Sequence, residues 1–247
     1  MTAILEVKQV NKSFGSVTAA HDINVSVKQS ERLGLIGTNG AGKTTFVNIV
    51  TGYVKPDSGT ILLQDRDITG HAPRSLTREG VCRSFQVPQL FLTLTTAQNL
   101  AVALGIANGR AYSPYATIDA EMEQAIDNLL ERFRLADYRE QIISELPGGV
   151  RKLIDIAVAV TRKPKILLLD EPTSGVAAEQ KFALMDIVMS ALDNDVTVLF
   201  VEHDMDIVSR YAQRVLAFYD GRIIADDVPK AVLENEIVRT HITGTAG

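Results

Sequence analysis

Runs of apolar residues divide the chain into predicted strands. Residues 4–10 read as a strand, and two more short strands follow as far as about Val27. Turns rather than helices separate them, which predicts an antiparallel sheet early in the fold. Three later runs are apolar almost without a break, at residues 32–36, 165–170 and 196–201. Unbroken apolar runs are typical of parallel strands that are covered on both faces.

Other segments have helical spacing. Between Thr95 and about Glu145 an apolar residue recurs every three or four positions, and residues 108–117 interrupt this pattern with a loop. Helices are also predicted over residues 45–50, 72–80, 153–161, 177–192 and in the tail from 230 to 247, and further strands over 60–64, 81–86, 215–219 and 222–225. The alternation predicts an α/β core (residues 1–86 and 159–247) with a helical insert (residues 87–158).

Composition narrows the class of protein. The 247 residues are 46% hydrophobic and 22% charged, with a net charge of −5, and this mild acidity argues against a nucleic-acid partner. No apolar run approaches the roughly 18 residues that cross a bilayer, and no export signal is apparent at the N-terminus. A single cysteine, Cys82, fits a reducing cytoplasm and is predicted to be a small buried hydrophobe.

Residues 37–45 have the phosphate-binding spacing G-x-x-x-x-G-K-T. Glycines let the backbone curl so that several N–H groups point at a phosphate chain, and the following helix adds its positive dipole end. A lysine reaches the β- and γ-phosphates, and a threonine hydroxyl can bind Mg²⁺. The predicted binding residues are Gly37, Thr38, Asn39, Gly40, Ala41, Gly42, Lys43, Thr44 and Thr45, with Thr44 also a metal ligand.

Two adjacent carboxylates, Asp170 and Glu171, end the buried strand at 165–170. We expect this strand to lie next to the one that precedes the phosphate-binding loop. Asp170 could then hold Mg²⁺ through its water shell, and Glu171 could accept a proton from an attacking water.

Polar residues end two other predicted strands. His203 could bond the γ-phosphate, and Gln86 could bond Mg²⁺ or the water, because parallel sheets gather ligands at the carboxyl ends of their strands. Phe14 could stack on an adenine ring or be a core aromatic, and the spacing leaves both open. His21, His71 and His241 are predicted to be surface or structural.

Gly148 and Gly149 come before the predicted helix at 153–161. Two glycines ahead of a helix N-terminus make a second phosphate-binding surface. Since one triphosphate already occupies the first loop, this surface is more useful across a dimer interface.

In this order and spacing, the motifs resemble those of the ATPase subunits of ABC transporters over nearly the whole chain. The resemblance implies a P-loop NTPase (RecA-like) core with an N-terminal antiparallel β subdomain and an inserted helical subdomain. It implies ATP and Mg²⁺ as cofactors, adenine stacking at Phe14, a Q-loop at Gln86 and a switch histidine at His203. The segment in place of the signature, which would act on the partner's ATP, is Leu146, Pro147, Gly148, Gly149 and Val150.

Within the family, the chain most resembles the importers of branched-chain amino acids and related small solutes. The resemblance implies a second ATPase subunit, an integral membrane permease, indirectly a solute-binding protein, and a peripheral place on the cytoplasmic face of the cell (inner) membrane. Alternatives are an ATPase of lipopolysaccharide export or a non-transport ABC ATPase. A P-loop kinase or GTPase would lack the glycine pair and the Glu171 equivalent, and we find no guanine-reading Asn-Lys-x-Asp.

Three positions in two motifs depart from the family pattern. Pro147 and Val150 replace the serine and glutamine of Leu-Ser-Gly-Gly-Gln, and Ala177 replaces the aspartate that ends the D-loop. Proline has neither hydroxyl nor N–H to offer a γ-phosphate, although it is well tolerated at a helix start. The contribution of this chain to its partner's site is therefore predicted to be weakened, and a heterodimer is predicted. The apolar segment 87–94 is predicted to line a groove for a permease helix.

Overall fold

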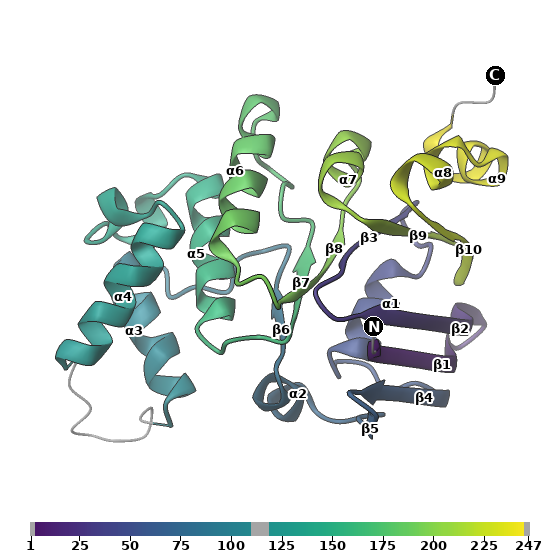
Figure 1. The fold of residues 1–247 in the computed structure, drawn as a ribbon, viewed down its shortest axis with the longest axis horizontal. Coiled ribbons are helices and arrows are strands. Elements are labelled where there is room, and N and C mark those ends of the chain that lie inside the picture. Colours follow the sequence, from purple (N-terminus) through teal and green to yellow (C-terminus); the bar gives the residue numbers. More distant parts are fainter. Residues whose placement is uncertain (1–2, 110–118, 245–247) are drawn as a thin grey trace.

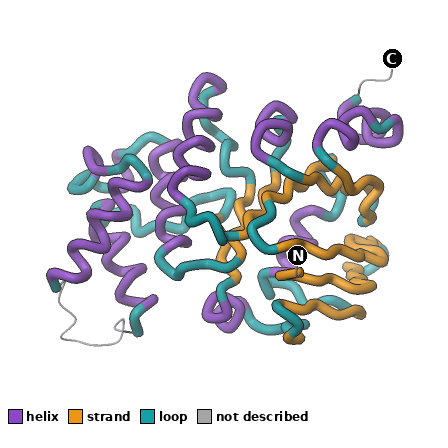
Figure 2. Tube along the Cα trace, viewed as in Figure 1, coloured by secondary structure: helices purple, strands orange, loops and turns teal. Residues whose placement is uncertain are grey.

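The computed structural model describes residues 3–109 and 119–244, so most of the predicted loop at 108–117 lies outside the described residues. In the described part, strands form two sheets, and helices group at the left end and along the top of the view (Figures 1 and 2). This arrangement confirms the predicted fold class, an α/β core with an antiparallel β subdomain and added helices.

The smaller sheet is antiparallel, in the order β2-β1-β4-β5. Its strands are β1 (Ala3–Phe14), β2 (Val17–Lys28), β4 (Ser58–Leu63) and β5 (Arg66–Asp67). The prediction of three short strands up to Val27 was wrong. The structure has one hairpin of two 12-residue strands, whose ladder continues through the polar residues 11–14 with register shifts. Hydrogen bonds between backbones do not depend on apolar side chains, so the pattern ended the first strand too early.

The larger sheet has the order β10-β9-β3-β8-β7-β6 and is parallel except for β10 at its edge. Its strands are β3 (Arg32–Gly37), β6 (Val81–Ser84), β7 (Ile166–Asp170), β8 (Thr197–Val201), β9 (Arg214–Tyr219) and β10 (Arg222–Asp227). β8 lies between β3 and β7, so the expectation that the strand of Asp170 adjoins β3 was wrong. Strand order depends on where each crossover helix packs, which a local pattern does not encode.

Helices cover this sheet and extend beyond it. They are α1 (Lys43–Val50), α2 (Pro73–Glu79), α3 (Thr96–Ala107), α4 (Ala120–Arg132), α5 (Gly148–Val160), α6 (Ala178–Ala191), α7 (Met205–Tyr211), α8 (Pro229–Glu234) and α9 (Glu236–Val238), with short helices η1 (Ala136–Tyr138), η2 (Ile143–Glu145) and η3 (Arg239–Thr243). α3, α4 and α5 stand together to the left of the sheet in Figure 1. These three helices correspond to the predicted helical insert, whose boundaries remain a prediction.

Each face of the larger sheet belongs to a different hydrophobic core. Leu167 and Leu169 of β7 pack into a core with α3 to α7, whereas Ile166 and Leu168 pack into a core with α1 and the smaller sheet. All five residues of β7 are buried, as are all five of β8. Apolar burial on both faces explains why these strands read as unbroken apolar runs.

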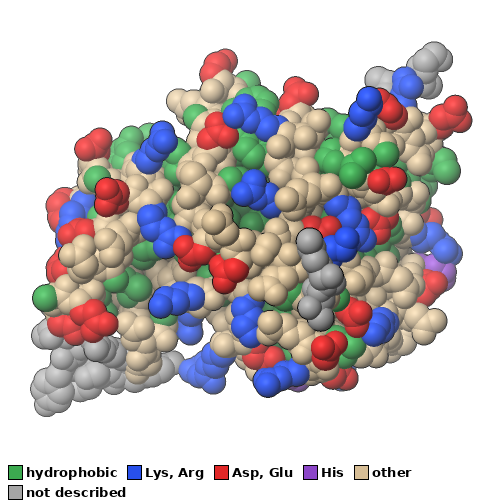
Figure 3. All heavy atoms as spheres, viewed as in Figure 1, with side chains coloured by type: hydrophobic (Ala, Val, Ile, Leu, Met, Phe, Trp, Pro, Cys, Tyr) green, Lys and Arg blue, Asp and Glu red, His purple; other side chains and the backbone are tan. Residues whose placement is uncertain are grey.

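The surface carries mixed charge. On the face drawn in Figure 3, basic and acidic side chains are interspersed over the helices and the sheets. No helix in the described ranges has the length and apolar character that crossing a membrane requires.

Cys82 in β6 is 3% exposed, and its burial raises the pKa of the thiol to about 11. We therefore expect the native protein not to react with Ellman's reagent at pH 8, because thiolate is the reactive form. In guanidinium chloride, one thiol per chain should react at once, and Cys82→Ala should remove that signal. Rapid labelling of the native protein would contradict the buried position of Cys82.

Candidate active site

The phosphate-binding loop joins β3 to α1 and is shaped by glycines at two crowded positions. Gly37 has φ 152° and Gly42 has φ 104°. A Cβ atom at Gly37 would lie 2.4 Å from the Phe218 carbonyl oxygen, and one at Gly42 would lie 2.5 Å from that of Ala19. Neither position accepts a side chain, so the loop is tied to β2 and β9 by close backbone contact.

Lys43 opens α1 and is 5% exposed. Its ammonium donates to the carbonyl oxygens of Gly37 (2.7 Å) and Thr38 (2.9 Å). Burial lowers the pKa of Lys43, and the carboxylates of Glu171 and Asp170 partly offset this effect. The phosphate-binding loop and the two acidic residues therefore share one electrostatic environment, although β8 separates their strands.

The carboxylate of Glu171 is held from two sides. Gln86 Nε2 donates to Glu171 Oε2 at 2.7 Å, and His203 Nε2 lies 3.1 Å from Glu171 Oε1. The three residues follow β6, β7 and β8, whose carboxyl ends meet at one edge of the sheet. The structure thus brings together the residues for which the sequence predicted catalytic roles.

Glu171 has a backbone conformation that side chains seldom adopt. Its φ is 48°, in the left-handed region, at the point where β7 ends. Such a conformation costs about 1–3 kcal/mol for a residue other than glycine and persists where the surroundings impose it. Here the Glu171 N–H donates to the Val201 carbonyl (3.1 Å), which fixes the turn to the end of β8.

Asp170 forms a buried ion pair. Arg83 Nη2 donates to Asp170 Oδ2 at 2.5 Å, and Nη1 donates to Asn48 Oδ1 at 2.7 Å. The guanidinium carbon lies 5.7 Å from the ring centre of Tyr53 and 4.9 Å from that of Phe85. These contacts orient the carboxylate through one of its two oxygens.

The oxygen donors that the sequence proposed for Mg²⁺ are hydroxyl, amide and carboxylate groups, which hard cations prefer. Thr44 is exposed at the start of α1. Gln86 follows β6, and Asp170 ends β7, which pairs with β6. Among the described residues, no cluster of three or more His, Cys, Asp or Glu side chains could hold a metal.

The glycine pair lies inside α5, because the helix begins at Gly148 instead of at the predicted residue 153. Glycine is a poor helix former, which hid this first turn from the sequence pattern. Pro147, with φ −58°, precedes the helix without a side-chain cap. The first N–H groups of α5 therefore lack partners within the helix, as at any helix start.

The signature segment, residues 146–150, lies beside residues 174–177, which take the place of the D-loop. Leu146 is buried, Pro147 and Gly148 are exposed, and Gly149 and Val150 are half-buried. A Cβ atom at Gly149 would lie 3.9 Å from the Val176 side chain. Ala177 sits at the N-cap of α6 and makes no side-chain cap bond, which an aspartate there could supply.

Phe14 lies at the end of β1 with its side chain 51% exposed. Its ring is therefore not a core aromatic, and the Lys12 ammonium lies 5.4 Å from its centre. The paired strand β2 reaches the phosphate-binding loop at Ala19. Among the histidines, His71 lies 3.3 Å from Glu79, and His241 stacks on Tyr219.

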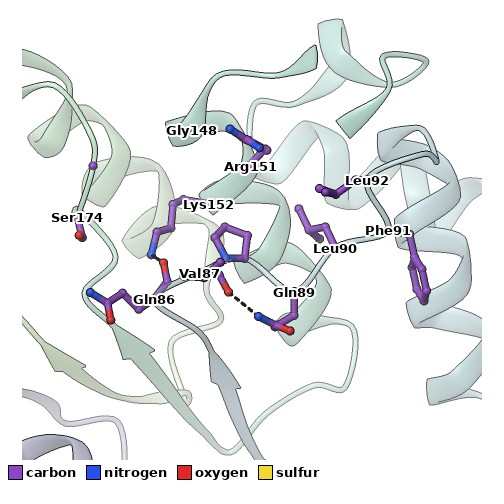
Figure 4. A pocket seen from close by; sticks show the side chains of 12 residues that line it. Gln86, Val87, Gln89, Leu90, Phe91, Leu92, Gly148, Arg151, Lys152 and Ser174 are labelled. Atoms are coloured by element: carbon purple, nitrogen blue, oxygen red, sulfur yellow. Dashed lines mark hydrogen bonds between the residues drawn. The ribbon is translucent and has the colours of Figure 1, made fainter. Parts of the chain in front are cut away.

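A cavity of about 630 Å³ opens between the Gln86 segment and the start of α5 (Figure 4). Val87, Phe91 and Leu92 contribute exposed apolar side chains. Leu90 packs partly against the helical core instead. The predicted groove segment is thus partly an internal joint and partly an open apolar surface.

Sequence reasoning missed four charged residues that hold this site: Arg83, Lys152, Asp155 and Glu202. Glu202 is 3% exposed and accepts from the Thr173 N–H (3.0 Å) and hydroxyl (2.7 Å), which ties the loop after Glu171 to the end of β8. Burial raises the pKa of Glu202, and these hydrogen bonds oppose that rise. The available signal for these four residues was the presence of a charged side chain in or next to an apolar stretch.

Comparisons with known proteins agree with this geometry. A family model described as "ABC transporter" matches residues 20–174. The chain is 31% identical to the high-affinity branched-chain amino acid transport ATP-binding protein LivG of Escherichia coli (strain K12), over 97% of both chains. It is 29% identical to BraF of Pseudomonas aeruginosa, also over 97% of both chains, whose name describes the same activity.

Solved structures match as well. The ADP conformation of an ATP-binding cassette of an ABC transporter superposes with a TM-score of 0.85 at 31% identity. The match covers 97% of this chain and 98% of that one.

We expect Glu171→Gln to bind ATP and hydrolyse it about 10²- to 10⁴-fold more slowly, because an amide cannot accept the proton of the attacking water. The variant keeps the size of the side chain. ATP should then hold a closed dimer, visible by size-exclusion chromatography with light scattering. Lys43→Ala is the matched control that should fail to bind ATP. Normal turnover by Glu171→Gln would require another base.

Proposed function

Because the chain belongs to the ABC transporter family, we propose that it is the ATP-hydrolysing subunit of an importer for branched-chain amino acids or a related small solute. The observation that carries this proposal is the Glu171 carboxylate, held between Gln86 and His203 at the sheet edge that bears the phosphate-binding loop. The names of LivG and BraF, which match over 97% of the chain, support the class of solute.

Residues 37–45 cradle the triphosphate through backbone N–H groups, and Lys43 neutralises the β- and γ-phosphates. When ATP replaces the Gly37 and Thr38 carbonyls as the partner of Lys43, the ammonium exchanges neutral acceptors for charged ones. The exposed ring of Phe14 stacks on the adenine.

Mg²⁺, when bound with ATP, draws charge from the phosphate oxygens. Thr44 and Gln86 would supply ligands to it, and Asp170, whose carboxylate Arg83 orients, would hold its water shell. The recorded bond from Arg83 uses Oδ2 of Asp170, which leaves Oδ1 as the oxygen for this role.

Glu171 takes the proton of a water that attacks the γ-phosphorus. A bond forms between the water oxygen and phosphorus, the bond from phosphorus to the β–γ bridging oxygen breaks, and the bond electrons remain on ADP. Gln86 and His203 keep the carboxylate pointed at this water. His203 also contacts the γ-phosphate and so responds to its loss.

The complete site needs a second subunit, since the first turn of α5 faces a partner's nucleotide. Gly148 and Gly149 offer N–H groups there, but Pro147 offers neither hydroxyl nor N–H, and Ala177 lacks the D-loop carboxylate. The working unit is accordingly a heterodimer in which the partner brings the stronger signature.

A permease helix docks on the exposed apolar side chains of segment 87–94. Asn99 is 3% exposed and fixes the backbone of Phe91 by accepting from its N–H (2.9 Å) and donating to its carbonyl (3.1 Å). The Phe91 side chain nevertheless stays 57% exposed. A rigid backbone that presents an apolar ring to solvent is suited to binding a partner. The chain thereby sits on the cytoplasmic face of the cell membrane.

Phe91→Glu should uncouple transport from hydrolysis. In vesicles that contain the permease, solute uptake should fall at least tenfold, while the basal ATPase rate stays within about twofold, because Phe91 is exposed outside the catalytic cluster. Ile237→Glu is the matched control, at 53% exposure in α9, and should leave both rates unchanged. Failure of the wild-type chain to co-purify with any permease would reject the importer, and loss of both rates in Phe91→Glu would show that Phe91 supports the fold and not only the docking of a permease.

The heterodimer is tested by mixing. The purified chain alone should hydrolyse ATP slowly, and adding its partner ATPase subunit should raise the rate at least tenfold above the sum of the two, because each site is completed from the other chain. Ala177→Asp should raise the rate of the isolated chain. Full activity of the isolated chain would contradict the unequal pair.

A further inference from the structure

A buried cation lies one turn into α5. Lys152 is 4% exposed, and its ammonium donates to the carbonyl oxygens of Phe85 (3.3 Å), Gln86 and Glu171 (3.2 Å) (Figure 4 shows the bond to Gln86). An ammonium has three N–H donors and no acceptor, so these three carbonyls match its bonding capacity. They come from two separate segments, the one after β6 and the one after β7.

Asp155 lies three positions later, on the same side of α5, and is also 4% exposed. Its Oδ2 accepts from the Ser84 hydroxyl (2.6 Å) and the Phe85 N–H (3.2 Å), and its Oδ1 accepts from the Gln89 N–H (2.8 Å). Together, Lys152 and Asp155 form hydrogen bonds with the segment from Ser84 to Gln89. Two charged residues of one helix therefore fix the segment that carries Gln86.

These bonds close a ring. Lys152 holds the backbones of Gln86 and Glu171, and the Gln86 side chain holds the Glu171 carboxylate. The ring joins three elements that are far apart in sequence. Any shift of α5 relative to the sheet must either move Gln86 and Glu171 with it or break the ring.

We infer that Lys152 is a positioning residue for ATP hydrolysis, which transmits the position of the signature helix to Gln86 and Glu171. The inference rests on the proposed function, since it assumes that α5 is drawn toward the partner's nucleotide at Gly148. Binding of the partner's nucleotide at Gly148 then positions Glu171, the general base of this chain's own site.

A space-filling role alone does not account for Lys152. Its desolvation lowers the pKa of the ammonium, and an uncharged side chain of similar length would avoid that cost. The bonds to carbonyls, with no carboxylate within bonding distance of the ammonium among the described residues, indicate that the charge is kept for its three directed donors.

Geometry explains why such a residue matters for rate. A misplacement of about 1 Å of a reacting group can cost about 10²-fold in rate without changing how substrate binds. Lys152 bonds neither to residues 37–45 nor to Phe14 among its recorded contacts, so ATP affinity should depend on it little. The expected signature is a change in kcat with KM almost unchanged.

The test uses the full chain with its partner subunit. Lys152→Met, which keeps the length and removes the donors, should lower kcat at least 30-fold and keep the KM for ATP within threefold. Lys152→Arg, which restores N–H donors, should recover at least a third of the wild-type kcat. Lys230→Met, an equal loss of charge on the exposed surface of α8, should match the wild type. A normal kcat in Lys152→Met would overturn the inference.

A double-mutant cycle separates positioning from general loosening of the fold. If Lys152 acts through Gln86, the double variant with Gln86→Ala should be no slower than the slower single variant. If the fold losses in kcat of the two single variants multiply in the double variant, the inference is overturned. Should Lys152→Met not fold, as judged by circular dichroism, Lys152→Gln carries the same cycle. Absence of ATPase activity in the wild type would instead reject the proposed function.

Discussion

The parallel arrangement of β6, β7, β8 and β3 is the constraint on which the site depends. Because their carboxyl ends share one edge, the phosphate-binding loop, His203, Glu171 and Gln86 converge there from four separate segments of the chain. Parallel pairing in turn requires both faces of the sheet to be covered. The two hydrophobic cores thus support the site by keeping its strands buried and in register.

Polar groups buried behind this edge fix the positions of Asp170 and Glu171, which the sheet alone would not fix. Arg83 orients Asp170, Glu202 ties the loop after Glu171 to β8, and Lys152 holds the turn at Glu171 itself. A buried charge is costly unless hydrogen bonds satisfy it, so each of these groups is stable in one arrangement only. The same bonds sustain the left-handed backbone at Glu171, which the local sequence would not choose.

The helical part connects to this edge chiefly through α5. Its first turn exposes Gly148 to solvent, and its second turn reaches back to the Gln86 segment. Segment 87–94 continues from Gln86 to the exposed apolar side chains of Phe91 and Leu92. A partner at either end of this path would thus contact elements that bond directly to the residues around Glu171.

The sequence alone was sufficient for the elements that have strong local signals. Glycines at 37 and 42 allow a backbone that no side chain permits, and unbroken apolar runs predicted β3, β7 and β8 within two residues. Chemistry placed at the ends of these strands then predicted Asp170, Glu171, Gln86 and His203 as one group. These features depend on neighbours in the chain, and so a pattern can report them.

Tertiary structure decided what depends on partners far away in sequence. β8 separates β3 from β7, α5 begins five residues earlier than its apolar pattern, and Arg83, Lys152, Asp155 and Glu202 became recognisable only when their partners were placed. A charged residue reads the same whether it is solvated or buried, because burial is set by what packs over it. The sequence therefore predicted which groups carry the chemistry, and the packing of α5 against the sheet determined how they are held.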